Sequence, residues 1–386
     1  MMIVKYLFSS PDGDIPAGPD QLASPFKIAP SKDHPHLCLK DYFEAIRDFV
    51  LGDNGGPPVT PLEERPFPNQ DCDDIHQLLI RSEKHGALYH IASVEIISPN
   101  RSTKLAVSTA LSERGKALLH NEYDLLSSLD TKFHLPYLPR PYELREVTCL
   151  INKREVTLLM LLAEWFEDYH EWHLQGDEED RIRKVSVWDH KNGYWVASPE
   201  ERDELFRQVA KTLTLYYDLQ DYTQISAWHH GAGDFIVKRE EGKIHTRLTT
   251  VRKYEETMRL LSDDAVNPMV AIVYFFLNLT IKIRLDRLEG VGKMVWADEF
   301  SVKTAIEGFF EAIYSMEREN RFYLGPVDDL LTLLRTFHPE DLHKIFDSLL
   351  LLYQHEDADK GDLDTIRENL DTHVGQVYKA LQDFRR

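Results

Sequence analysis

The alternation of apolar and polar positions places a β-rich block in the first half of the chain. The elements expected there are strands at Ala87–Ile97 and Lys104–Ala110, a helix at Lys116–Leu129, and strands at Tyr142–Ile151 and Glu155–Leu162. Asn152-Lys153 is predicted to be the turn between the last two strands. Residues 81–163 are therefore expected to form a small lobe with the order β-β-α-β-β.

Helical periodicity dominates the chain after residue 164. Ser198 is predicted to cap a helix that reaches about Leu219, with Glu201 completing a capping box. A hairpin is expected next, with strands at Asp234–Lys238 and Ile244–Val251. Further helices are predicted at 255–262, 269–288, 299–316, 327–337, 340–353 and 362–385. Residues 164–386 are therefore expected to form a large, mainly helical lobe.

Proline and acidic residues mark the segments without clear periodicity. Eleven of the nineteen prolines precede residue 70, so residues 1–80 are predicted to be an irregular Pro-rich extension with one short helix at Asp41–Leu51. A linker is expected at 55–61. Residues 164–180 contain eight acids and no lysine or arginine, which predicts a solvated connector. The extension is expected either to wrap the small lobe or to cover a cleft.

Charge and composition narrow the classes of partner. The chain has 386 residues, with 45 Lys and Arg against 65 Asp and Glu, and hence a net charge of −20. This excess of acid argues against nucleic acid and anionic membranes, which need basic surfaces. The longest apolar run, 269–281, is too short to cross a bilayer, and the N-terminus does not have the pattern of a signal peptide. Three cysteines without metal-ligand spacing indicate reduced thiols, so a cytoplasmic protein is expected.

Three motifs occur in a characteristic order. Leu162-Ala-Glu-Trp-Phe follows the small lobe, His230-Gly-Ala-Gly-Asp-Phe-Ile-Val precedes the predicted hairpin, and Asn267-Pro-Met-Val-Ala-Ile-Val-Tyr-Phe opens an apolar helix. Their order resembles that of the protein-kinase-like fold, of the aminoglycoside phosphotransferase and choline kinase type. The resemblance covers residues 86 to about 325. It implies an α+β fold of two lobes, a small antiparallel β lobe with one helix and a larger helical lobe, and an activity that uses ATP and Mg²⁺.

Only some of the family's nucleotide-binding positions have a match in this sequence. The strand lysine that holds the phosphates is replaced by Ser108, so Lys104 or Lys116 would have to supply the charge. Glu122 matches the helix glutamate that orients this lysine, although a rim carboxylate on a solvated helix is an equal alternative.

The segment after the small lobe supplies two further cofactor-binding candidates. These are Glu164 and Trp165, together with the neighbouring aromatic residues. The aromatic side chains either line a ligand cleft or pack the connector. Tyr89-His90 alternates on a predicted strand, and a packing role is expected for this pair.

The positions that bear the chemistry depart from the family. His229 stands where the family has its catalytic Asp; it is a base near neutral pH or simply a loop histidine. Asp234 replaces the Asn that holds Mg²⁺ and is the candidate metal ligand. Thr249 stands where the second metal-binding Asp is expected.

These departures favour a pseudokinase-like protein, impaired in phosphoryl transfer. Such a protein would bind a nucleotide, a small ligand or a protein partner in or near the cleft between the lobes. Two alternatives remain. One is a divergent, active ATP-dependent phosphotransferase that acts on a small-molecule hydroxyl. The other is a metal-dependent enzyme that uses His229 and His230.

Overall fold

The chain folds into two compact units. The first comprises Met1–Glu167 with His190–Asn192, and the second comprises Asp168–Asp189 with Gly193–Arg386. The computed structural model describes residues 2–10, 13–29, 32–52, 75–85, 89–176, 183–189, 191–226, 234–256, 266–290, 292–355 and 360–385. The linker expected at 55–61 lies outside these residues.

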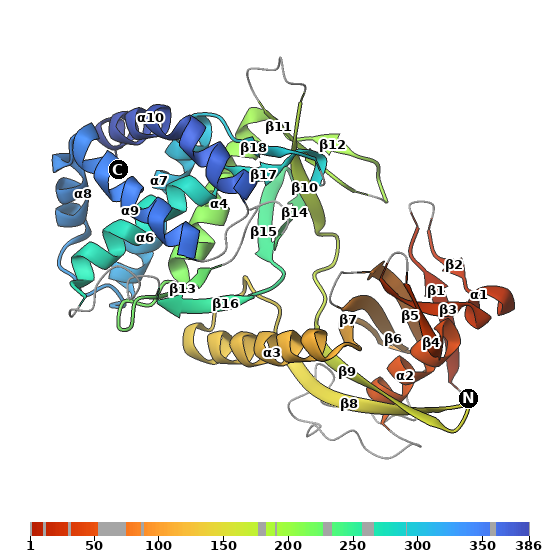
Figure 1. The fold of residues 1–386 in the computed structure, drawn as a ribbon. Helices are drawn as coiled ribbons and strands as arrows, with labels where there is room; N and C mark the ends of the chain where they lie inside the picture. Colours follow the sequence, from red (N-terminus) through yellow and green to blue (C-terminus); the bar gives the residue numbers. More distant parts are fainter. Residues whose placement is uncertain are drawn as a thin grey trace. The chain divides into compact units, whose positions relative to one another are not determined.

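The first unit is built on a seven-stranded sheet (Figure 1). In spatial order its strands are β2 (Ile15–Pro16), β1 (Ile3–Phe8), β5 (Gln77–His85), β6 (His90–Ser98), β7 (Arg101–Ala110), β9 (Arg154–Glu164) and β8 (Pro141–Ile151). β1 runs parallel to β5, and all other neighbours are antiparallel. The remaining elements are α1 (Pro19–Ala23), β3 (Pro25–Ala29), β4 (Lys32–Cys38), α2 (Leu39–Leu51) and α3 (Glu113–Phe133).

Local sequence explains the tightest connection in this sheet. Ile151 of β8 pairs with Arg154 of β9, which leaves Asn152 and Lys153 as a two-residue turn. Both have positive φ, 50° and 66°, the conformation that matches the twist of a hairpin. The predicted strand-turn-strand unit is therefore present.

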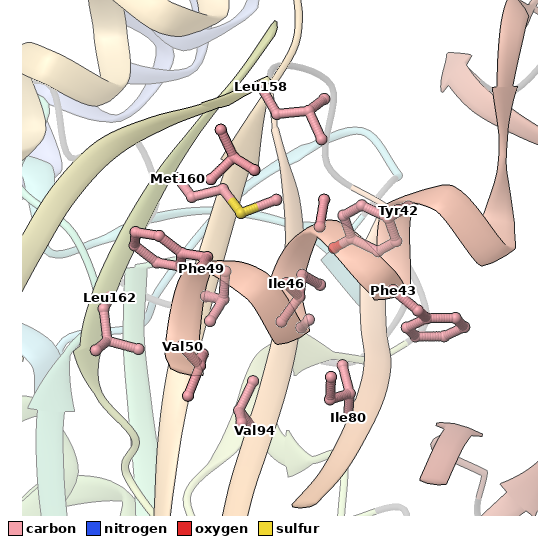
Figure 2. Close-up of a cluster of buried hydrophobic side chains, with 14 of the residues drawn as sticks. Tyr42, Phe43, Ile46, Phe49, Val50, Ile80, Val94, Leu158, Met160 and Leu162 are labelled. Atoms are coloured by element: carbon pink, nitrogen blue, oxygen red, sulfur yellow. The ribbon is translucent and has the colours of Figure 1, made fainter. Parts of the chain in front are cut away.

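Helix α2 covers one face of the sheet and supplies much of its core (Figure 2). Tyr42, Phe43, Ile46 and Phe49 are all at most 1% exposed and pack on strand residues of the sheet. Burial of each such side chain stabilises the fold by about 1.5–3 kcal/mol. A second, smaller cluster joins Leu119 of α3 to the sheet.

The N-terminal residues are part of the first unit, which differs from the expected Pro-rich extension over 1–80. β1 adds a parallel strand to the sheet, so the sheet is mixed, and α1 and α2 join α3, so the unit has more than one helix. The prolines do not prevent regular structure here, because Pro25 begins β3 and Pro35 lies in β4, a strand of a two-stranded ribbon. Edge strands of this kind tolerate a missing N–H donor.

The second unit combines a five-stranded sheet with a group of helices (Figure 1). The sheet order is β12 (Trp195–Val196), β11 (Lys184–Val187), β10 (His170–Gln175), β14 (Phe235–Glu240) and β15 (Lys243–Leu248). Two smaller pairs are β13 (Thr223–Ser226) with β16 (Lys253–Glu256), and β17 (Leu285–Arg287) with β18 (Met294–Trp296). The helices are α4 (Pro199–Leu215), α6 (Pro268–Lys282), the 3₁₀ turn η5 (Leu288–Gly290), α7 (Phe300–Arg318), α8 (Val327–Thr336), α9 (Pro339–His355) and α10 (Lys360–Asp383).

The predicted start of α4 is confirmed. The Ser198 hydroxyl accepts from the Glu201 N–H at 3.2 Å, and the Glu201 carboxylate accepts from the Ser198 N–H at 2.9 Å. This reciprocal pair satisfies two backbone donors that a helix start otherwise leaves open. No helix in the described part of the chain combines the length and the apolar character needed to cross a bilayer.

Three expectations for the second unit are wrong in part. The acidic segment 164–180 contains β10, whose Trp172 is 2% exposed, because β11 and β14 flank this strand and complete its hydrogen bonding. Residues 255 and 256, where a helix over 255–262 was expected to begin, instead end strand β16, and 257–265 lie outside the described residues. The helix expected over 269–288 ends at Lys282, because the following residues pair as β17 with β18.

Candidate functional site

Asp234, the candidate metal ligand, carries a bidentate ion pair with Arg252. Asp234 immediately precedes β14 and is 4% exposed. Nη1 of Arg252 donates to Oδ2, and Nη2 donates to Oδ1, each at 2.6 Å. Paired guanidinium donors match the geometry of a carboxylate and form one of the stronger polar contacts in proteins.

The hairpin register brings Arg252 to this position. Phe235 pairs with Leu248, so the chain leaves β15 directly beside Asp234. The N–H and the hydroxyl of Thr249 donate to the carbonyl oxygen of Asp234 at 2.9 and 3.0 Å. Thr249 therefore binds the backbone of Asp234 and adds no carboxylate. The sequence did not indicate Arg252 as a partner of Asp234. Counting across the hairpin places residue 249 opposite residue 234, but it does not show which side chain beyond residue 249 turns back to Asp234.

The electrostatics of Asp234 reflect burial and its neighbours. Burial raises the pKa of the Asp234 carboxyl above its ordinary value, the charge of Arg252 opposes this shift, and Glu171 adds to it. Mg²⁺ needs carboxylate oxygens that face the ion, whereas both oxygens of Asp234 face a cation that belongs to the chain. Within the described residues no three His, Cys, Asp or Glu side chains cluster in a way that fits a metal ion. The donor set around Asp234 does not fit Mg²⁺.

The two histidine candidates cannot be placed. His229 and His230 lie outside the described residues. The proposals that His229 is a base, or that the two histidines bind a metal, thus remain predictions from sequence.

In the first unit, Glu122 is held by a tyrosine. Glu122 lies on α3, which begins where the Ser112 hydroxyl accepts from the Gly115 N–H at 3.0 Å. Glu122 is 8% exposed, and its Oε2 accepts from the Tyr89 hydroxyl at 2.5 Å. The packing role expected for Tyr89 is thus accompanied by a polar one. Sequence alone did not indicate it, because Tyr89, which precedes β6, is 33 residues from Glu122 and the two meet only in the folded unit.

The two candidate lysines pair with other carboxylates. Lys104 Nζ lies 3.4 Å from Oε2 of Glu167 and 4.5 Å from the centre of the Trp165 ring. Lys116 Nζ lies 3.3 Å from Oε1 of Glu146. Trp165 therefore contacts a lysine through its ring face, a cation–π arrangement.

Ser108 and Glu164 both lie on strands of the sheet in the first unit. Ser108 is half-buried near the C-terminal end of β7, opposite Ile91 of β6 and Leu161 of β9. Glu164 is exposed at the end of β9, where its carboxylate accepts from the Arg140 N–H at 3.3 Å. Glu164 thus stabilises the entrance to β8.

The sheet face that carries Lys104 and Ser108 is rich in acid. Arg81 donates to Asp14 and to Glu95, both at 2.8 Å, and the Ser93 hydroxyl donates to Glu83 at 2.5 Å. Strand register places Lys104 opposite Glu95 and Ser93 opposite Ala106, so these side chains share one face. Burial raises the pKa of Glu95, but hydrogen bonds from Ser102 and Arg81 outweigh it and leave the pKa lowered. Glu95 is therefore held as an anion.

A comparison of the chain with protein-family models and with curated proteins finds no match.

Proposed function

We propose that this chain is a kinase-like protein that does not transfer phosphoryl groups and acts by binding a ligand or a protein partner. The arrangement of elements supports the kinase-like part. Strands β5, β6, β7, β9 and β8 are antiparallel neighbours, and α3 connects β7 to β8. In the second unit, the hairpin β14–β15 follows α4, as the resemblance implies.

The observation that carries the proposal is the pairing of Asp234 with Arg252. Phosphoryl transfer depends on metal ions that neutralise the phosphates, and those ions need anionic ligands. Here a guanidinium satisfies the one carboxylate that stands at the family's metal position. Thr249, at the second metal position, offers a hydroxyl that is already bonded to backbone.

The charges of the first unit support the same conclusion. The strand position that would hold the phosphates is Ser108, and Lys104 is engaged with Glu167. Glu95 and Glu83 lie on the surrounding sheet face and repel phosphate. Losing a single charge that stabilises a transition state costs orders of magnitude in rate.

The test is a thermal-shift titration with ATP, with and without Mg²⁺, combined with an assay for ADP formation. We expect no metal-dependent rise in Tm and no ADP formation above that of the Asp234→Ala variant. Binding to the native state alone would raise Tm by mass action.

The matched control is Arg239→Ala. Arg239 also makes a bidentate pair, at 2.7 and 2.8 Å to the carboxylate of Glu201, but away from Asp234. A Tm rise of several degrees that requires Mg²⁺, persists in Arg239→Ala and disappears in Asp234→Ala would show that Asp234 binds the metal, and would remove the observation that carries the proposal. Turnover with the same pattern would establish the active phosphotransferase instead.

A further inference from the structure

Helix α10 is anchored in the second unit through a buried histidine. α10 packs against α6, α7, α8, α9 and β18 (Figure 1). His373, near its middle, is 0% exposed. Its ring lies 4.9 Å from the ring of Phe346 on α9 and 5.6 Å from that of Trp296 on β18, measured between centroids.

Arg284 approaches His373 from the segment between α6 and β17. Its Nε and Nη2 donate to the carbonyl oxygen of Ala297 at 2.9 and 2.7 Å. Its Nη1 donates to Gln376 Oε1 at 2.7 Å and lies 2.8 Å from His373 Nδ1. A guanidinium has no lone pair to offer, so His373 Nδ1 is the acceptor in this contact.

The second ring nitrogen defines the same protonation state. Nε2 of His373 lies 3.2 Å from Oγ1 of Thr280, and this hydroxyl donates its own hydrogen to the Leu277 carbonyl oxygen at 2.7 Å. Nε2–H therefore donates to Thr280. Both contacts require a neutral imidazole that carries its hydrogen on Nε2.

We infer that His373 is an acid-sensitive latch for α10: the neutral ring holds the helix in place, and protonation of Nδ1 releases it. A proton on Nδ1 would remove the acceptor of Arg284 and place two cations in contact. Release of α10 separates the cations and exposes the imidazole to water. This inference is independent of the proposed function.

The surroundings of His373 determine the sign of the effect. Burial lowers the pKa of His373 well below its ordinary value, and the charge of Arg284 lowers it further. Asp298 and Glu299 lie close enough to raise the pKa of Arg284, but burial outweighs them and lowers it to about 9. A released helix would take up a proton at the ordinary histidine pKa of about 6.5. Docking of α10 is therefore fully present above that pH and weakens about tenfold per pH unit below it.

The other charged contacts of α10 do not reproduce this dependence. On the surface, His343 of α9 lies 3.0 Å from Asp371 and 3.1 Å from Asp347. The hydrogen bond with Asp371 is the main cause that raises the pKa of His343, so that contact is favoured by acid.

Two further cationic contacts reach the C-terminal part of α10. Arg335 of α8 donates to the carbonyl oxygens of Leu381 and Phe384 with a permanent charge. Lys379 lies 3.6 Å from Glu299, and both side chains are more than half exposed. Neither contact requires a neutral partner, so acid does not turn them into repulsion.

Hydrogen exchange of the full chain between about pH 7.5 and about pH 5, corrected for intrinsic exchange, tests the latch. We expect opening of α10 to increase about tenfold per pH unit below about 6.5, while α4 keeps its protection. His373→Asn keeps an acceptor for Arg284 but does not titrate, so its α10 should show no such increase. The matched control, His343→Gln, should retain the increase. Equal acid opening in His373→Asn and wild type would overturn the inference.

A second measurement does not depend on a variant being well folded. The histidine ring signals of the wild-type chain can be followed by NMR, with His373 identified as the signal that shows the slowest solvent exchange. We expect its ring to remain neutral at a pH where the surface histidines are protonated. Titration of His373 near 6.5 with α10 still protected would refute the latch.

Discussion

At the scale of single residues, two buried carboxylates that the resemblance singles out are bound by other side chains of the same chain. Arg252 binds both oxygens of Asp234. Tyr89 donates to Glu122, the residue matched to the lysine-orienting glutamate. Both contacts satisfy a buried carboxylate, which would otherwise be costly to remove from water. Both contacts therefore stabilise the fold.

Removal of Arg252 should destabilise the protein through Asp234. Asp234 is buried, so Arg252→Ala leaves its carboxylate without a charge partner. Because the Arg252 side chain is 48% exposed, solvent screens the pair, and we expect the free energy of unfolding to fall by about 1–3 kcal/mol. Adding Asp234→Asn to this variant should restore most of the loss, because the amide needs no counter-charge. Urea unfolding measures both effects. Arg239→Ala, which frees a more accessible carboxylate, should cost less than about 1 kcal/mol; an equal cost at both sites would contradict this explanation.

The deficit of Arg252→Ala should depend on pH. Burial already raises the pKa of Asp234, and loss of the opposing cation should raise it further. The folded state then binds a proton more tightly than the unfolded state, so the variant regains stability relative to wild type as the pH falls through the raised pKa. Unfolding free energies measured from neutral pH down to about pH 4.5 would show the two curves converging. Parallel curves would indicate that Asp234 is not the group responsible.

At the scale of elements, the helices of the second unit owe their packing to small local features. Gly308 of α7 faces α4 where the two helices approach closely. A Cβ at this position would overlap the Arg207 carbonyl oxygen and lie 2.9 Å from Ala210 Cβ, both closer than van der Waals contact allows. The absence of a Cβ at residue 308 therefore permits the close contact between α4 and α7. In the sequence, Gly308 shows only as an interruption of a helical pattern. Ion pairs between Glu311 of α7 and Lys211 of α4 lie beside it.

Gly308→Ala should separate α4 from α7. The added methyl group meets backbone, which cannot turn aside as a flexible side chain does, so we expect a loss of about 1–3 kcal/mol. Gly375 of α10 is the matched control, because nothing lies within 4 Å of a Cβ built there. Gly375→Ala should be neutral or stabilising by about 0.5–1 kcal/mol, since alanine favours the helix. Thermal unfolding of the two variants distinguishes these effects, and similar Tm values would contradict the close-approach explanation.

At the scale of the whole molecule, the N-terminal segment is structural. α2 seals one face of the sheet of the first unit (Figure 2). β1 extends that sheet beside β5. A chain expected to carry a separable extension over 1–80 instead uses those residues to close its first core. The boundary predicted at residue 81 therefore falls inside the first unit.

A truncated chain that begins at Asp74 should lose the stability of its first unit. Removing α2 exposes to water the apolar residues of β5, β6 and β7 that pack against Phe43, Ile46 and Phe49. We expect this to cost several kcal/mol. We expect hydrogen-exchange protection of β6 and β7 to fall in this variant, while α7 remains protected. A truncated chain that is soluble, with unchanged protection in β6 and β7, would show that α2 is dispensable.

Features that depend on neighbouring residues could be predicted from the sequence. The turn at Asn152-Lys153, the capping box at Ser198 and the helix around Glu122 follow from dihedral preferences, local hydrogen bonds and periodicity. These interactions are local, so a linear pattern is enough to predict them.

Contacts between groups that are distant in the sequence required the folded chain. Arg252 is 18 residues from Asp234, Tyr89 is 33 from Glu122, and Arg284 is 89 from His373. The parallel pairing of β1 with β5 likewise joins strands far apart in the chain. Such contacts depend on sheet register and helix packing, and no local preference specifies them. For that reason Asp234 and Glu122 could be singled out from the sequence, whereas their partners Arg252 and Tyr89 emerged only from the fold.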